Sequence, residues 1–257
     1  MNIFKMLTFI ISLLCVDSKL VELNEDNLIT LRGTVNSDSV SKWIRDINLI
    51  NDDDIYMYIT SPGGSVLQGM AFIEQLNALK LSGKKINCIA DFAASMAFVI
   101  FQSCSTRYVL DSSVLMQHQM ALELGGNLIN VENYLKFIND NDLKLTREQA
   151  LRLNMTSIDF HNKVMNDWWI TGDSALEHNL ADEKINVKCS KDLFRKTETI
   201  NIRTIFGEVT LEFYKCPIIS NPVNVNIDSQ YHKFIKYYIP DLAINELKKR
   251  NYVPNFD

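Results

Sequence analysis

The sequence is poor in glycine and proline and has no excess of positive charge. Nine Gly and five Pro among 257 residues exclude a collagen-like chain and a disordered chain rich in these two residues. The formal net charge of −5 offers no basic surface, so we expect no nucleic-acid partner. With 47% hydrophobic residues, the remaining expectation is a folded globular protein of one large or two small domains.

Cysteine is scarce as well, and its distribution excludes two kinds of site. The five cysteines stand at positions 15, 88, 104, 189 and 216, and no two form a C-x-x-C pair. They are too few and too scattered for a disulfide scaffold, and neither a zinc site nor a thioredoxin-type site is supported. Their spacing leaves open whether they pair.

The apolar stretch near the N-terminus is too short to cross a membrane. It runs from Met6 to Val16 after Lys5, and its length as a helix is only about 16 Å, against a hydrocarbon core of about 30 Å. A basic residue, a short apolar run and a small residue such as Ser18 at the cleavage point are typical of a secretory signal peptide. We therefore expect residues 1–18 to be a signal peptide of an exported or secretory-pathway protein. The alternative is a buried N-terminal helix or strand in a cytoplasmic or organelle-matrix protein.

Short apolar runs alternate with stretches whose apolar residues recur at helical spacing. The short runs predict strands at 28–31, 55–60, 86–90 and 114–117. The helical stretches lie at 40–50, 66–81, 96–103 and 131–153. This alternation predicts an α/β fold of parallel βαβ units.

The C-terminal part differs from the rest of the chain in the sign of its charge. Residues 188–257 carry 11 Lys and Arg against 8 Asp and Glu, so we expect a separate extension of unknown role after a main domain at 19–187. Its pattern predicts a β-hairpin over 197–215, turning near Phe206-Gly207, and a closing helix over 231–250.

Three local patterns carry the chemistry. Ser61-Pro62-Gly63-Gly64 ends an expected strand, where glycine lets backbone N–H groups turn toward a ligand oxygen. Ser95 lies between small residues at the start of an expected helix, whose free N–H groups would face a developing oxyanion. His118 closes the strand at 114–117, from which its imidazole could face Ser95. Each pattern alone is weak, because such turns, helix-capping serines and single histidines are usually structural.

Together, these motifs resemble those of the Clp protease proteolytic subunit (ClpP) family of the ClpP/crotonase superfamily. The sequence Ala93-Ala94-Ser95-Met96 is similar to that around the family's nucleophile, and Met116-Gln117-His118-Gln119 resembles its Met-Ile-His-Gln. The resemblance covers residues 27–187. It implies an α/β, ClpP/crotonase-like spiral of βαβ units with a protruding handle helix after Gly125-Gly126, through which two rings stack. The C-terminal hairpin plus helix would be an addition to that fold.

The resemblance also implies a catalytic triad. Ser95 takes the place of the nucleophile and His118 that of the general base. The run from Ala175 to Asp182 is similar to a family motif that follows the catalytic acid, which makes Asp167 the acid. Other candidate acids, ranked lower, are Asp159 and Asp173.

The mechanism implied by these residues is acyl transfer without a metal or organic cofactor. Backbone N–H groups of Gly64 and Met96 would form the oxyanion hole. The leading interpretation is a serine endopeptidase that cleaves peptides or unfolded proteins inside a homo-oligomeric chamber of stacked rings. One alternative is a non-catalytic ClpP-like subunit that acts as a scaffold in a mixed ring. Others are a crotonase-type acyl-CoA enzyme and a Ser-Lys peptidase of the signal-peptide-peptidase type, for which Lys84 and Lys85 are not suitably placed.

Several positions depart from the family pattern. Asp91-Phe92 stands in place of Gly-Gln before the nucleophile motif, Met120 in place of Pro, and Asn179 in place of Gly. In the family the N-terminus forms axial loops that contact an AAA+ unfoldase, so the resemblance implies such a partner. The signal-like N-terminus of this chain departs from that arrangement. His161, His178 and His232 have no partner at a suitable spacing and are interpreted as structural.

Overall fold

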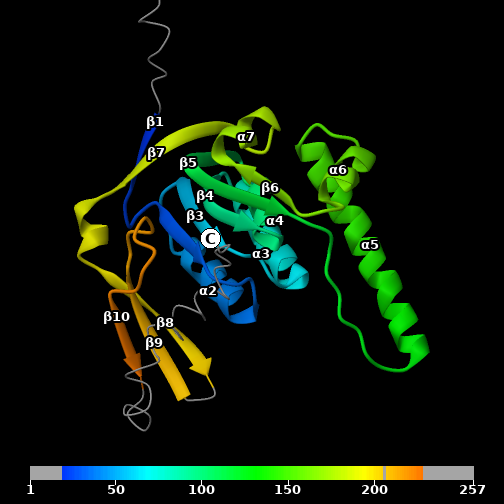
Figure 1. Cartoon of the computed structure of the whole chain (residues 1–257). Helices are drawn as coiled ribbons and strands as arrows, with labels where there is room; N and C mark the ends of the chain where they lie inside the picture. Colours follow the sequence, from blue (N-terminus) through cyan, green and yellow to red (C-terminus); the bar gives the residue numbers. More distant parts are fainter. Residues whose placement is uncertain (1–18, 205–206, 228–257) are drawn as a thin grey trace, which may run out of the picture.

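A computed structural model describes residues 19–204 and 207–227 of the chain. The expected signal peptide at 1–18 and the expected closing helix at 231–250 lie outside these residues. The described chain forms a seven-stranded sheet flanked by helices and a separate three-stranded sheet (Figure 1). Its helices include none that combines the length and the apolar character needed to cross a bilayer.

The strands and helices that the sequence predicts appear in the predicted order, together with others that it does not predict. The strands of the main sheet are β1 (Lys19–Leu23), β2 (Leu28–Arg32), β3 (Asp54–Ser61), β4 (Lys85–Ala94), β5 (Thr106–Gln117), β6 (Trp168–Thr171) and β7 (Glu183–Cys189). The helices are α2 (Ser37–Asn48), α3 (Val66–Leu81), α4 (Met96–Gln102), α5 (Leu128–Arg152), α6 (Ser157–Val164), α7 (Gly172–Glu177) and the short 3₁₀ helix η1 (Lys191–Phe194). The small sheet contains β8 (Thr197–Thr204), β9 (Gly207–Tyr214) and β10 (Asn224–Ile227).

The main sheet is built from successive βαβ units. Its strand order is β1-β7-β5-β4-β3-β2, with β6 paired to β5. The ladders β2–β3, β3–β4 and β4–β5 are parallel, and only the short β6 among these strands pairs antiparallel. Helices α2, α3 and α4 connect neighbouring strands, which confirms the predicted α/β architecture.

The sheet buries apolar side chains on both faces, because successive residues of a strand point to opposite sides. In β3, Met57 and Ile59 belong to the core that packs against α2, α3 and α4. Tyr58 points the other way, into a second cluster with Ile89 and Leu193. The near-continuous apolar run of β3 follows from this double burial.

Residues after β7 cover that second face. Leu193 of η1 and Cys216, just beyond β9, are buried in the second cluster. The guanidinium of Arg32 lies 4.6 Å from the ring centroid of Phe213 and donates to the main-chain carbonyls of Ile219 and Ser220. The predicted hairpin is confirmed as β8–β9, and β10 adds a third antiparallel strand. The boundary expected between residues 187 and 188 stays a prediction, and β7 runs continuously through it.

Two disulfides, which the cysteine spacing did not determine, constrain the chain. Cys88 in β4 pairs with Cys104 just after α4, with Cα atoms 6.0 Å apart. Cys189 at the end of β7 pairs with Cys216, at a Cα distance of 5.9 Å. Closing a loop of this size stabilises a fold by about 3 kcal/mol in the chain-entropy account. The first disulfide therefore fastens both ends of the segment that carries Ser95, and the second fastens the C-terminal hairpin to the main sheet.

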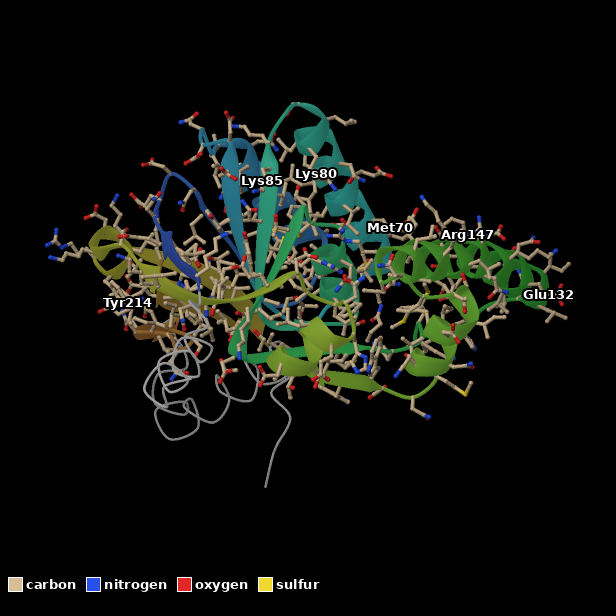
Figure 2. The ribbon with its side chains drawn as sticks, turned by 90° about the horizontal axis from the view of Figure 1, so that it is seen from above. Met70, Lys80, Lys85, Glu132, Arg147 and Tyr214 are labelled. Atoms are coloured by element: carbon tan, nitrogen blue, oxygen red, sulfur yellow. A yellow bond between two sulfur atoms is a disulfide. The ribbon has the colours of Figure 1, made fainter. Side chains whose placement is uncertain are left out.

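Helix α5 stands away from the sheet, on the side opposite the small sheet (Figure 1). Figure 2 shows Glu132 near its outer end and Arg147 closer to the body. The buried residues of α5 all lie in its second half, at Leu145, Gln149 and Ala150. Its exposed large apolar side chains are Leu128, Ile129, Tyr134, Leu135, Phe137, Leu143 and Leu151. Such an exposed apolar surface is typical of a protein-contact region, and the helix occupies the position of the expected handle.

Candidate active site

Three segments with candidate chemistry follow neighbouring parallel strands. Pro62-Gly63-Gly64 follows β3, Ser95 follows β4 and His118 follows β5. The ladders continue to Ser61 opposite Ala93 and to Ala94 opposite Met116. Because carboxyl ends of parallel strands share one edge of a sheet, the fold gathers the three segments at one place.

Ser95 occupies a sharp turn between β4 and α4 with an unusual backbone conformation. Its φ is 55° and its ψ is −124°, a region that side-chain-bearing residues rarely adopt and that is associated with strain at functional sites. Its backbone N–H donates to the Met116 carbonyl at 2.9 Å, which holds the turn in place. The Ser95 hydroxyl makes no capping bond to α4. This strand–turn–helix geometry, which presents a serine hydroxyl, is that of a nucleophile elbow.

The Ser95 hydroxyl contacts the imidazole of His118. The distance from Ser95 Oγ to His118 Nε2 is 2.9 Å, within the range needed for proton transfer. The backbone N–H of His118 donates to Gln117 Oε1 at 3.2 Å, and Gln117 Nε2 donates to Gln149 Oε1 of α5 at 2.5 Å. This buried glutamine pair, which no local sequence pattern indicates, ties the segment that bears His118 to α5.

Gly63 packs directly against the turn that holds Ser95. Its φ is +86°, and a Cβ built there would lie 2.5 Å from the Ala94 carbonyl oxygen, 2.7 Å from the Met96 nitrogen and 2.8 Å from the Ser95 Cβ. Glycine is therefore required for steric and conformational reasons at once. The pattern Pro-Gly-Gly suggested a turn but did not reveal this contact.

Gly64 is held beside the same turn by the strand-like segment around Val35. Val35 donates to the Gly63 carbonyl at 2.8 Å and accepts from the Ser65 N–H at 2.8 Å. Within residues 19–204 and 207–227, neither the Gly64 N–H nor the Met96 N–H forms a hydrogen bond. Both residues line the cavity next to Ser95, so these two donors are available to an oxyanion there.

Asp167 lies next to His118 by strand register but not by side-chain contact. The antiparallel ladder β5–β6 ends with Gln117 opposite Trp168, and the same register continued by one residue sets His118 opposite Asp167. The Asp167 side chain is exposed and forms no hydrogen bond within the described part of the chain.

The two other candidate acids are engaged elsewhere. The Asp173 carboxylate accepts from Lys184 Nζ at 2.7 Å. The Asp159 carboxylate accepts from the hydroxyl of Thr156 at 2.7 Å, in the cap of α6. None of the three acids lines the cavity at Ser95, and Asp167 is distinguished by the strand register, which continues to a position opposite His118.

A cavity of about 420 Å³ opens beside Ser95 and His118, bounded by α5, α6 and the segment after β5. His161 of α6 lines it, although the sequence spacing of this residue predicts a structural role. His178 instead packs edge-on against Trp168, with ring centroids 5.7 Å apart. Among the residues that the structure describes, no three His, Cys, Asp or Glu side chains are grouped to hold a metal ion.

Asp91, one of the departures from the family pattern, lies outside this cavity. Its carboxylate accepts a hydrogen bond from the Thr60 hydroxyl at 3.1 Å. Burial raises the pKa of the Asp91 carboxyl, and this outweighs the opposing effects of the Thr60 hydrogen bond and of the Arg32 charge. The residue belongs to the polar surroundings of β3 and β4, whereas Met120, another departure, lines the cavity.

Comparison with known proteins agrees with the geometry. The profile of the family described as Clp protease matches residues 16–188. The ATP-dependent Clp protease proteolytic subunit 2 of Tropheryma whipplei (strain Twist) is 27% identical over 164 residues, which cover 62% of this chain and 90% of the relative. The ATP-dependent Clp protease proteolytic subunits of Streptococcus pyogenes serotype M5 (strain Manfredo) and Streptococcus equi subsp. equi (strain 4047) are each 28% identical over 171 residues, 62% of this chain and 84% of the relative.

Proposed function

This chain belongs to the Clp protease family, whose profile covers more than half of it, and on that premise we propose that it is a serine endopeptidase with a Ser95-His118-Asp167 triad. Family membership supports a ClpP-like peptidase, and the three residues of the proposed triad suggest that its mechanism is of the serine type. The observation that carries the proposal is the 2.9 Å contact between Ser95 Oγ and His118 Nε2 at a strained strand-to-helix turn.

In this mechanism Ser95 Oγ attacks the carbonyl carbon of a peptide bond while His118 Nε2 takes its proton. His118 then returns the proton to the leaving amine, and an acyl-enzyme remains on Ser95. Water attacks this ester with His118 again as the base, which releases the acid product and restores the serine. The backbone N–H groups of Gly64 and Met96 stabilise the negative oxygen of each tetrahedral intermediate.

The peptidase proposal is tested by turnover. Purified full-length protein is incubated with fluorogenic peptides and with denatured casein, beside the Ser95→Ala variant. We expect the wild type to hydrolyse both and the variant to be slower by about 10⁴-fold or more. A wild-type protein that is folded and oligomeric but releases no product would contradict the peptidase and favour the non-catalytic scaffold subunit.

We propose that Asp167 orients His118 by accepting from its second ring nitrogen. Strand register supports this role, because β6 begins directly after Asp167 and pairs with the end of β5. Asp167→Asn is expected to lower kcat by about 10²–10⁴-fold, since an amide favours the wrong tautomer of the imidazole. Asp173→Asn is the control, because Asp173 pairs with Lys184 away from the cavity. Equal effects of the two substitutions on kcat would contradict the assignment.

We further propose that the chain forms a homo-oligomeric chamber. The exposed apolar side chains of α5 would be covered by contact with other copies of the chain.

We also propose export to an oxidising compartment. If residues 1–18 are removed as a signal peptide, Cys15 is lost and the four remaining cysteines are those of the two disulfides, which persist in oxidising compartments. The relatives are named as ATP-dependent, and an AAA+ unfoldase is the corresponding proposed partner.

A further inference from the structure

One face of α5 forms a wall of the cavity beside Ser95. The residues of this face recur at helical spacing and all line the cavity: Leu135, Ile138, Asp142, Leu145 and Gln149. Gln149, at the inner end, is bonded to Gln117 next to His118. From Gln149 toward the outer end of α5, the same helix face carries the buried Leu145 and then Asp142.

Among the described residues that line this cavity, Asp142 supplies the single carboxylate, and the other titratable side chains are those of His118 and His161. No lysine or arginine lines the cavity among the described residues. Asp142 is half-buried, and within the described part of the chain its carboxylate forms neither a hydrogen bond nor an ion pair. A substrate that placed an apolar side chain against Asp142 would desolvate the carboxylate without supplying a hydrogen bond or an ion pair, which is unfavourable.

The spacing along the helix suits a long basic side chain. Asp142 lies seven residues before Gln149, about 10 Å along the helix axis. A lysine carries its ammonium on a flexible four-carbon stem, and an ion-paired hydrogen bond adds about 2.8 Å. Its methylene groups would pack on Leu145 and Ile138, as the stems of lysine and arginine do on apolar surfaces.

From this arrangement we infer that Asp142 determines specificity, so that the enzyme prefers lysine or arginine at the residue that supplies the scissile carbonyl. The inference rests on the proposed serine peptidase and names its substrate class. Asp142 pairs with the ammonium or guanidinium group while the carbonyl lies at Ser95. Aliphatic side chains lack this ion pair, and acidic side chains are repelled.

Two peptidyl diphenyl phosphonates test the inference. They react with an activated serine by forming an Oγ–P bond and releasing phenol, and they differ only in carrying lysine or its uncharged analogue norleucine at the first position. The full-length protein is labelled with each, and the ratio of the two second-order rates is measured. We expect a lysine-to-norleucine ratio of about tenfold or more in the wild type, and a ratio near one in Asp142→Asn.

Asp140→Asn is the matched control. Asp140 lies two residues away on the same helix, is exposed and does not line the cavity, so this variant should keep the wild-type ratio. A wild-type ratio of one or less, or an unchanged ratio in Asp142→Asn, would overturn the inference. Labelling with a general fluorophosphonate distinguishes failure of the specificity inference from failure of the peptidase proposal. If this reagent labels the protein while the lysine-to-norleucine ratio is one or less, the specificity inference is wrong but the serine-peptidase proposal is not affected. If it does not label the folded protein, the peptidase fails and the specificity fails with it.

Discussion

His118→Ala is expected to slow peptide hydrolysis by about 10⁴-fold or more, an effect as large as that expected for Ser95→Ala. Without the imidazole, 2.9 Å from Ser95 Oγ in the wild type, the hydroxyl keeps its proton and is a poor nucleophile. Initial rates of hydrolysis of a fluorogenic peptide, measured at matched protein concentrations, give the effect.

Rescue by added imidazole separates a base from a structural role. The variant leaves a space beside Ser95 where free imidazole can act as the base, so part of the lost rate should return with imidazole concentration. Thermal unfolding should show the variant to be folded. A variant that hydrolyses peptide as fast as the wild type would contradict the role assigned to His118.

Gly63→Ala is expected to impair both stability and activity. The added Cβ would meet three atoms of the Ser95 turn at 2.5 to 2.8 Å, and alanine is also disfavoured at a φ of +86°. Together the steric overlap and the backbone strain should lower the free energy of unfolding by about 3 kcal/mol. Displacement of Ser95 and of the Met96 N–H should lower kcat by about 10²-fold.

Gly83→Ala provides a matched control for the backbone contribution. Gly83 has a φ of +99°, and a Cβ added there would meet nothing within 4 Å, so this variant carries the conformational penalty of about 1–2 kcal/mol without the overlap. Urea unfolding midpoints and kcat are compared for the two variants. If Gly63→Ala and Gly83→Ala lose the same stability and Gly63→Ala keeps the wild-type kcat, the close contact of Gly63 with the Ser95 turn is not needed for stability or catalysis.

The sequence predicted the elements from β2 to α5 in order and type, because apolar periodicity reflects which side of each element is buried, but it did not predict β1, β6, β7, α6 or α7. Helix α3 was predicted with its observed bounds. Strands β4 and β5 are longer than predicted, since Asp91 and the polar residues near Ser113 interrupt their apolar runs while the backbone pairing continues past register shifts. The long helix predicted over 131–153 ends at Arg152, and Asn154 follows it in an exposed turn with a φ of +56°.

The features that the sequence could not reveal depend on distances between segments far apart in the chain. The glutamine pair Gln117–Gln149, the close approach of Gly63 to Ser95 and the pairing of the cysteines have no local signature. Nor does the motif that ends at Asp182 reveal that the carboxylate of this residue pairs with the buried Arg107. Although burial alone would raise it, the hydrogen bonds from Arg107 lower the pKa of the Asp182 carboxyl.

Fluorophosphonate labelling of the full-length protein, with the modified residue identified by peptide mass spectrometry, tests directly whether His118 activates Ser95. We expect a single label on Ser95 in the wild type, none in Ser95→Ala and a strongly reduced rate of labelling in His118→Ala, because only an activated serine reacts rapidly. A label on a different residue, or no label on protein that is folded and oligomeric, would contradict the assignment of Ser95 as a nucleophile activated by His118.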